Sequence, residues 1–427
     1  MSQNSEANPY RRIPFVSGAA PGRGHFEEFC AHPAFFLQRA FRECGEVCEF
    51  DQGGMRTVLM VGPEAHEAVF RAPDEQLSAP AAYQYMVPIF GPGVQYGAPI
   101  EVERQQLKMH AKGLRAERMT WYAPIVAREV EDWIAGWGDE GEMDFYAAFA
   151  DLTIKTSTHC LLGSEFRYSL TDEFARHYHD LGEAADAAGT VDHAQQKAVY
   201  DRRDRARKAL GELIIERIER RRQAGEAHDD LLQVYMDATL LDGSRLSDEQ
   251  IAGMVVWFMF AGHHTSANTS AWTLVELARY PDFGAEVTAE VDQLFATETE
   301  LSFRALRKMP LMEGFIREIL RAHPPLNALC RRVMQDFHYK DYCIEAGKNV
   351  MLSPYVAHRL PQYFPDPERF DPHRPEPGNV FAYIPFGGGQ RKCVGNAFAI
   401  LQVKTIFGTL LRDFEFELAG PPGEYRE

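Results

Sequence analysis

The chain has 427 residues and a formal net charge of −17, from 45 Lys and Arg against 62 Asp and Glu. Nucleic-acid binding depends mainly on Lys and Arg contacts to phosphates, so this charge argues against a nucleic-acid partner. The seven scattered cysteines form no disulfide framework and suit a reducing compartment. The longest apolar run, IAGMVVWFMFAG, has 12 residues, short of the roughly 18–20 that a membrane-spanning helix needs. With no apolar signal at the N-terminus, the sequence predicts a cytoplasmic protein without a membrane anchor.

The predicted elements begin with an extended lead-in over residues 1–25, which are rich in Pro, Gly and polar groups. Two β-prone runs around a Gln-Gly-Gly turn predict a hairpin over 47–61, and Pro63 is expected to open a short helix. Helix-forming sequence dominates residues 100–320. Within it, residues 205–222 carry apolar side chains at helical spacing and charges elsewhere, which predicts an amphipathic surface helix.

The last hundred residues change character. Short strands and turns are predicted over 336–353, and a Pro-rich loop follows over 364–379. The segment 396–414 is apolar at helical spacing and predicts a final helix. No internal repeat or low-complexity linker separates these parts. We therefore predict one mainly α-helical domain over residues 1–427, with a smaller β portion.

The longest predicted helix contains the unusual stretch AGHHTS, with His263 and His264 side by side. Ser247 and Gln250 form a capping-box pattern at its start, and the helix can run to Tyr280, before a proline. Its first turns are apolar on most faces, so they must be buried. Neighbouring residues on a helix point about 100° apart, so the two histidines cannot share a metal as an H-x-x-x-H pair can. This argues against a metallohydrolase.

The loop FGGGQRKCVG, residues 386–395, places Cys393 after three glycines and just before the last helix. Glycines allow positive φ and a close approach of the backbone to a flat ligand. The helix N-terminus favours the thiolate form of a nearby cysteine. A thiolate in this position suits a nucleophile or an axial haem ligand, and the plainer alternative is a buried cysteine in a Gly-rich turn.

This loop resembles the haem-binding signature F-x-x-G-x-R-x-C-x-G of the cytochrome P450 family. The fixed positions are matched by Phe386, Gly389, Arg391, Cys393 and Gly395. The resemblance implies the P450 fold, a triangular prism holding haem b between the long distal helix and the helix after the cysteine loop. It also implies that Cys393 is the axial iron ligand, that Phe386 packs against it, and that Arg391 pairs with a haem propionate.

A second family motif, E-x-x-R, is matched by Glu318 and Arg321, one helical turn apart. With the downstream Pro-rich loop it resembles the buried charged triad of the family. Arg369 or Arg374 would be its third member, and the sequence does not choose between them. These residues are expected to be structural, since removing one partner would leave a buried charge unpaired.

Two stretches resemble the sterol 14α-demethylase branch in its soluble bacterial form. One is AGHHTS, with histidine where most relatives have an acid before the threonine. The other is AYQYMVPIFGPGVQY, where the signature positions are matched by Tyr83, Pro88, Phe90, Gly91, Val94 and Tyr96. Tyr85 departs from the signature's Phe, Leu or Ile, and Gly97 from its Asp. The sequence also stops at GPPGEYRE, about where the family adds a final β-hairpin.

The resemblance implies roles for isolated residues elsewhere in the chain. Thr265 and His264 would serve oxygen activation, with His264 relaying protons. Propionate contacts are implied at Tyr83, His110 and Arg331. The residues implied in the substrate pocket are Tyr85, Met86, Phe90, Val94, Phe260, Ala261, Thr265 and Leu326.

The implied reaction is a monooxygenation that uses O2 and external electrons on a bulky hydrophobic substrate. For a 14α-methyl sterol, three rounds would give the alcohol, the aldehyde and then formate with C–C cleavage. No flavin or iron–sulfur domain is encoded, so a separate ferredoxin or flavodoxin with its reductase would supply the electrons. This partner would dock at a basic patch that includes Arg391 and Lys392. The protein itself is expected to be a monomer. The alternatives are hydroxylation of another lipid (a steroid, terpenoid or fatty acid) and a non-catalytic haem or lipid binder.

Overall fold

The structure is a computed structural model that describes residues 10–187, 193–225, 228–421 and 425. The chain divides into two compact units. The first comprises Met1–Gln84, Leu326–Arg369 and Glu376–Cys393, and the second Tyr85–Pro325, Phe370–Pro375 and Val394–Glu427. Each is built from separated stretches of chain, so the single domain of the sequence analysis stays a prediction. Among the described residues, no helix is both long and apolar enough to cross a membrane.

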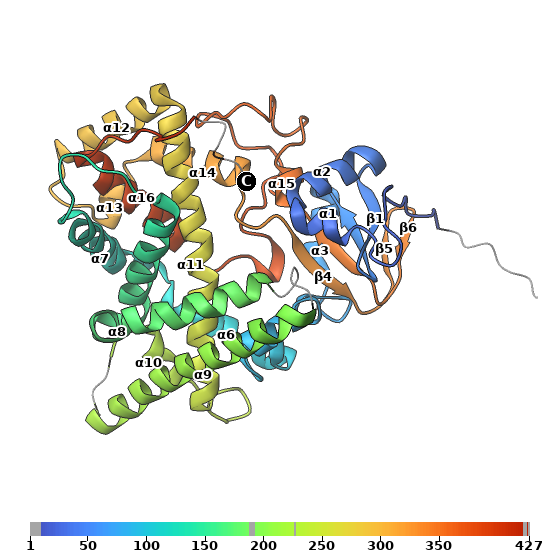
Figure 1. Ribbon diagram of the computed structural model, residues 1–427, viewed down its shortest axis with the longest axis horizontal. Coiled ribbons are helices and arrows are strands. Elements are labelled where there is room, and N and C mark those ends of the chain that lie inside the picture. The colour runs from blue at the N-terminus through green and yellow to red at the C-terminus, as the bar shows by residue number, and fades with distance from the viewer. Residues whose placement is uncertain (1–9, 188–192, 226–227, 422–424, 426–427) are drawn as a thin grey trace, which may run out of the picture. The chain divides into compact units, whose positions relative to one another are not determined.

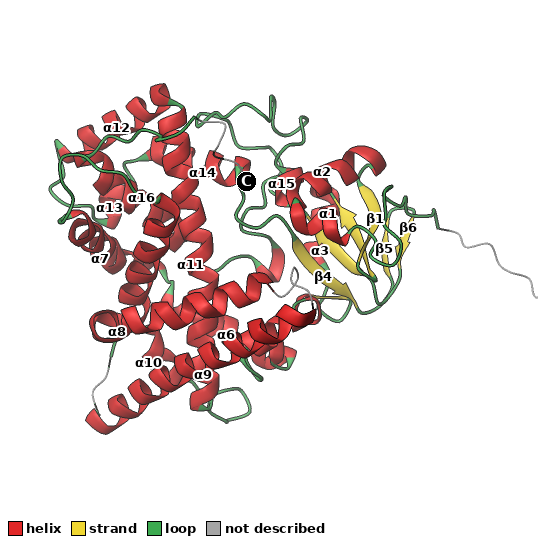
Figure 2. Cartoon of the chain, viewed as in Figure 1, coloured by secondary structure: helices red, strands yellow, loops and turns green. Residues whose placement is uncertain are grey.

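The first unit holds all the strands of the described chain and several short helices (Figure 2). Its elements are α1 (Phe26–Ala31), α2 (Pro33–Cys44), β1 (Val47–Gln52), β2 (Met55–Met60), α3 (Pro63–Arg71), β3 (Leu77–Ser78), α4 (Ala79–Ala82), β4 (Leu329–Val333), β5 (Phe337–Tyr339), β6 (Tyr342–Ile344), β7 (Asn349–Leu352), α15 (Pro354–Ala357) and the 3₁₀ turn η3 (Gly389–Arg391); the turn η1 (Gln84–Met86) spans the boundary.

A five-stranded sheet in the order β1-β2-β7-β4-β3 forms the centre of this unit, and β5 and β6 form a separate pair. Only β2 and β7 pair in parallel, with Thr57 opposite Asn349; the other neighbours are antiparallel. The sheet therefore joins the N-terminal hairpin to strands almost 300 residues later in the chain.

Both faces of this sheet are buried, and the alternation of side chains along each strand explains how. On β2, Val58 and Met60 belong to one hydrophobic core, which includes Phe70 of α3. Leu59 points the other way, into a core with Phe36 of α2. Successive side chains of a strand point to opposite faces, so a continuous apolar strand requires cover on both sides.

The second unit is helical. Its elements are α5 (Val87–Phe90), the 3₁₀ turn η2 (Gln95–Gly97), α6 (Ile100–Gly113), α7 (Ala116–Ile134), α8 (Phe145–Ala187, with a break at Gly163), α9 (His193–Ala224), α10 (Leu231–Met236), α11 (Asp248–Arg279), α12 (Pro281–Phe295), α13 (Phe303–Leu306), α14 (Pro310–Ala322) and α16 (Asn396–Asp413).

Helix α11 is the central element of the second unit. It has 32 residues, and at 1.5 Å per residue it is roughly 48 Å long. Figure 1 shows it in yellow, running the length of the unit, with α8 in green across it. Ser247 and Gln250 make both bonds of the predicted capping box. The helix ends at Arg279, since Pro281 cannot continue it and begins α12 instead.

Most elements predicted from the sequence are confirmed. The hairpin over 47–61 is β1 and β2, Pro63 begins α3, residues 205–222 lie in α9, and the last helix is α16. Helices α1 and α2 were missed. They carry the polar and aromatic residues that follow the lead-in, and their apolar faces become evident only against the sheet.

Candidate functional site

Cys393 lies at the end of a tight loop in the first unit. Its backbone N–H donates to the carbonyl of Phe386 at 2.9 Å, which closes the loop into a turn around Gly387–Lys392. Of the seven cysteines, Cys393 is the one that is exposed; the others are buried or half-buried. The loop therefore presents Cys393 at a surface.

Two glycines let this loop lie directly on the end of α3. A Cβ at Gly388 would lie 2.6 Å from the ring of Phe70, and one at Gly389 would lie 2.1 Å from the carbonyl oxygen of Phe70. Gly389 also has a φ of +64°, where residues with a side chain are strained. These two glycines are thus required by close contacts with Phe70 of the protein itself.

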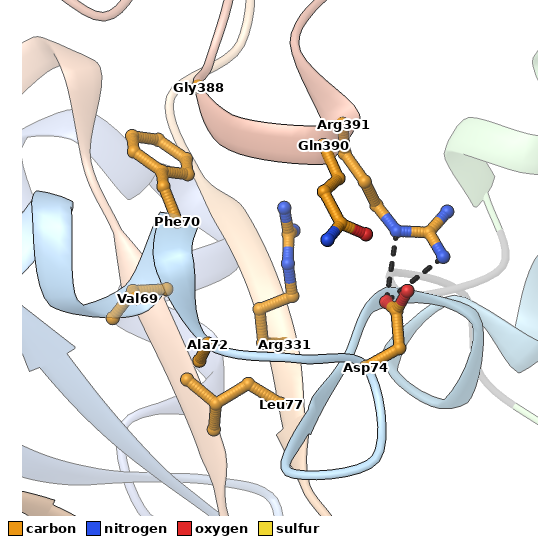
Figure 3. Close-up of a pocket in the computed structure, with 9 residues that line it drawn as sticks. All are labelled: Val69, Phe70, Ala72, Asp74, Leu77, Arg331, Gly388, Gln390 and Arg391. Atoms are coloured by element: carbon orange, nitrogen blue, oxygen red, sulfur yellow. Dashed lines mark hydrogen bonds and ion pairs between the residues drawn. The ribbon is translucent and has the colours of Figure 1, made fainter.

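Beside the loop is a small pocket in which two arginines have different surroundings (Figure 3). Arg391 turns toward Asp74 and donates to its carboxylate at 3.0 and 3.1 Å. Arg331 stands next to Gln390 and donates to the carbonyl of Cys330. In the described part of the chain, no carboxylate forms an ion pair with Arg331, and burial lowers the pKa of its guanidinium.

These contacts distinguish the candidate anion-binding residues. The guanidinium of Arg331 has donors left for an acidic ligand, whereas Arg391 already has a carboxylate partner that the sequence did not indicate. Tyr83 lies in the same unit, where its hydroxyl accepts from the N–H of Cys330 at 3.0 Å. An exposed thiol and an arginine without an acidic partner fit a haem, which needs a ligand for iron and a cation for its propionates.

In the second unit, the AGHHTS segment of α11 interrupts an otherwise buried helix. Ala261 is exposed, although α11 is buried over most of its length. The Thr265 hydroxyl donates to the carbonyl of Ala261 at 3.0 Å. Its oxygen can still accept a hydrogen bond, because a hydroxyl has two lone pairs. The segment therefore combines an open surface with a polar group.

The two histidines of this segment have different environments. His263 is buried, and its Nε2 donates to the carbonyl of Ala150 on α8 at 2.8 Å. Burial lowers the pKa of His263 to about 3, with the neighbouring His264 as a smaller cause, so this ring is neutral at physiological pH. His264 is half-buried between the rings of Tyr178 and Phe260. His263 therefore connects two helices, while His264 remains a candidate for proton transfer.

The predicted substrate residues divide into buried and exposed groups. Phe90 and Val94 are buried and pack against α11, where Phe90 contacts the ring of Phe260 at 5.5 Å between centroids. Met86 is half-buried. Tyr85 is 59% exposed, and Leu326, which belongs to the first unit, is 49% exposed. The structure thus brings Phe90, Val94 and Phe260 together within the second unit.

His110 has partners that the sequence did not indicate. It is completely buried on α6, and both ring nitrogens lie within hydrogen-bonding distance of protein groups, Gln95 and Tyr235. A propionate contact would require His110 to give up one of these partners. We therefore leave His110 out of the residues proposed below to hold the haem.

Arg374 is the third member of the charged triad, for which the sequence left Arg369 and Arg374 open. Arg321 donates twice to the carboxylate of Glu318, at 2.8 Å each, and Arg374 Nε lies 3.2 and 3.3 Å from its two oxygens. The backbone N–H of Asp371 donates to the same group at 2.9 Å. Arg369 belongs to the first unit. All three triad side chains are buried.

An exposed cysteine in a glycine loop, with two arginines lining the pocket beside it, fits the class of haem–thiolate proteins. Comparison with known proteins agrees: the sequence profile of the family Cytochrome P450 matches residues 16–424. The chain belongs to the cytochrome P450 family. It is a haem-dependent monooxygenase, and as a family member it takes a hydrophobic substrate and electrons from redox partners.

Several individual relatives are similar to this chain over most of their length. It is 41% identical to a protein from Mycolicibacterium vanbaalenii named sterol 14alpha-demethylase, over 97% of this chain and 94% of the relative. A Mycobacterium tuberculosis protein of the same name is also 41% identical over 97% and 94%. The human lanosterol 14-alpha demethylase is 34% identical over 95% of this chain and 81% of its own. The solved structure of retinoic acid-bound cyanobacterial CYP120A1 shares the fold, with a TM-score of 0.82, 21% identity, and coverage of 95% and 92%.

Proposed function

We propose that this protein is a sterol 14α-demethylase. The observation that carries the proposal is 41% identity over 97% of the chain to proteins with that name. The signature residues around Phe90 and the AGHHTS segment of α11 lie within the matched region and support it.

In this proposal the first unit holds the haem. Cys393 supplies the sulfur ligand, Phe386 forms the other end of its turn, and Arg331 offers donors to a propionate, with Tyr83 beside it. Gly389 supplies a positive φ in the loop, Gly395 directly precedes the final helix, and Arg391 pairs with Asp74. The haem, when bound, supplies the activation of O2.

The second unit would supply the groups that move protons and contact substrate. The Thr265 oxygen can accept a hydrogen bond while its hydroxyl proton is donated to the carbonyl of Ala261. His264 is half-buried and would relay protons, since an imidazole ring can both accept and donate a proton. On a 14α-methyl sterol, three successive oxidations, each using one O2 and two electrons, would convert the methyl group to the alcohol and the aldehyde and then cleave it from C14 as formate, leaving a double bond in the sterol.

Replacing His264 by alanine is expected to divert most electrons from product to peroxide, because the relay is lost. Replacing His263 by alanine is expected to lower stability but leave the ratio of product to NADPH consumed much closer to the wild-type value, because the Nε2 of the buried His263 ring is engaged with the carbonyl of Ala150. The measurement is that ratio, with peroxide quantified in parallel. Equal losses of coupling in both variants would contradict the role given to His264.

The sterol assignment is tested by titrating the ferric protein with 14α-methyl sterols and following the Soret band. We expect a substrate-type shift, and turnover with a surrogate ferredoxin system should release formate and the demethylated sterol. A steroid, terpenoid and fatty acid panel serves as the control.

The second candidate is hydroxylation of another bulky lipid. It is favoured by Tyr85 and Gly97, which depart from the sterol signature, and Tyr85 is exposed. A shift and product with a panel lipid, and none with any sterol, would favour this candidate over demethylation.

We also propose that the electrons come from a separate ferredoxin or flavodoxin with its reductase, and that the protein acts as a monomer in the cytoplasm. The exposed Lys392 beside Cys393 is a candidate docking cation, whereas Arg391 is largely engaged with Asp74.

A further inference from the structure

A group of four buried polar side chains surrounds the turn that follows Phe90. Gln95, Gln106, His110 and Tyr235 are all 0% exposed. They come from η2, α6 and α10 of the second unit. Burying a polar group is unfavourable unless it is hydrogen-bonded, so a fully enclosed group of this size requires an explanation.

The side chain of Gln106 hydrogen-bonds to backbone groups of the turn and holds it in place. Its side-chain oxygen accepts from the N–H of Gln95 at 2.7 Å, and its side-chain nitrogen donates to the carbonyl of Gly93 at 2.8 Å. Gln95 has a φ of +44°, a conformation that costs a residue with a side chain on the order of 1–2 kcal/mol. The two bonds from Gln106 therefore hold the backbone in a shape that it would otherwise leave.

The side chain of Gln95 extends the group to two more helices. Its amide nitrogen donates to His110 Nε2 at 2.7 Å, so the ring proton is on Nδ1, which donates to the hydroxyl of Tyr235. Burial lowers the pKa of His110 to about 3, so the ring stays neutral and this pattern does not change near neutral pH. Trp257 and Phe258 of α11 stack on the same ring at 4.6 and 5.1 Å.

The turn held in this way carries residues of the candidate substrate pocket. Val94 directly precedes Gln95, and Phe90 lies just before the turn and contacts Phe260. Any Cβ at Gly253 of α11 would lie 2.2 Å from the carbonyl of Phe90, so the segment is fitted closely to the helix. A small displacement of the turn would therefore move the residues proposed to contact substrate.

We propose that Gln95, His110 and Tyr235 are positioning residues that hold the segment Phe90–Gly97 in its substrate-binding conformation. The inference deepens the proposed function, because it takes this segment as part of the substrate site. It gives His110 a part in substrate affinity.

The test compares Tyr235→Phe with Tyr122→Phe. Both variants remove one hydroxyl from a buried tyrosine; Tyr122 donates to the carbonyl of Gly113, at the opposite end of α6 from the turn. Amide hydrogen exchange in peptides covering residues 86–98 is expected to be about tenfold faster in Tyr235→Phe and unchanged in Tyr122→Phe. Sterol affinity from the Soret titration should fall about tenfold in Tyr235→Phe only.

Gln95→Gly is a second variant that should fold, since glycine accepts a positive φ. It removes the donor to His110, so exchange over 86–98 should also rise. Haem content, measured from the reduced CO spectrum, should stay at the wild-type level in both variants. Unchanged exchange in Tyr235→Phe and Gln95→Gly would overturn the proposal, and so would loss of haem with unchanged exchange, which would return His110 to a propionate role.

These outcomes are separate from those of the sterol assignment. If the wild-type protein binds another lipid, the proposed function fails, but the exchange rates still decide whether the three residues hold the turn. The affinity measurement is then made with the lipid that gives the Soret shift.

Discussion

Replacing Glu318 by alanine is expected to lower the free energy of unfolding by about 3–5 kcal/mol, the cost of breaking a buried ion pair. The carboxylate receives hydrogen bonds from Arg321, Arg374 and the backbone of Asp371. Removing it leaves two buried guanidinium groups without their acidic partner. Urea unfolding of the purified protein, followed by far-ultraviolet circular dichroism, measures the change.

Glu216→Ala is the matched control. Glu216 also pairs with an arginine, Arg220, but the two side chains are 57% and 61% exposed. Exposed pairs of this kind contribute roughly 0.3–0.5 kcal/mol, so this variant should remain close to the wild-type stability. Equal losses in the two variants would show that burial of the triad contributes nothing to the fold.

The elements that could be predicted from the sequence are those set by local chemistry. The capping box at Ser247, the proline after Tyr280 and the glycines of the Cys393 loop act within a few residues of their own position. Each gives a boundary or a turn that neighbouring side chains cannot easily override. The helix, the hairpin and the cysteine loop were therefore predicted correctly.

The contacts that could not be predicted join residues far apart in the chain. Asp74 and Arg391 are separated by 317 positions, and His110 and Tyr235 by 125. No local pattern marks either pair. The sequence could not decide between Arg369 and Arg374 for the same reason, because only the path of the Pro-rich loop determines which guanidinium reaches Glu318.

His110 shows how a resemblance can single out a residue and leave its role open. The family pattern implied a propionate contact, and a histidine on an amphipathic helix is compatible with one. Gln95 and Tyr235 are unremarkable in the sequence, yet in the structure they occupy both nitrogens of the ring. A buried glutamine with positive φ was the signal that only the structure could provide.

Cys393 as the thiolate ligand of haem iron is the central assignment for this protein. A thiolate donates electron density to iron and favours O–O cleavage, and neutral ligands do so much less. Cys393 is exposed at the end of its loop, whereas burial raises the pKa of the thiol of Cys330 to about 11, which keeps that cysteine protonated. Cys343, half-buried on β6, provides a control position.

The most direct test is the absorption spectrum of the dithionite-reduced protein under carbon monoxide. We predict the red-shifted Soret band of a thiolate-ligated haem in the wild type and in Cys343→Ala, and its complete loss in Cys393→Ala. An imidazole-type Soret band in the wild type, or the red-shifted band persisting in Cys393→Ala, would contradict the assignment.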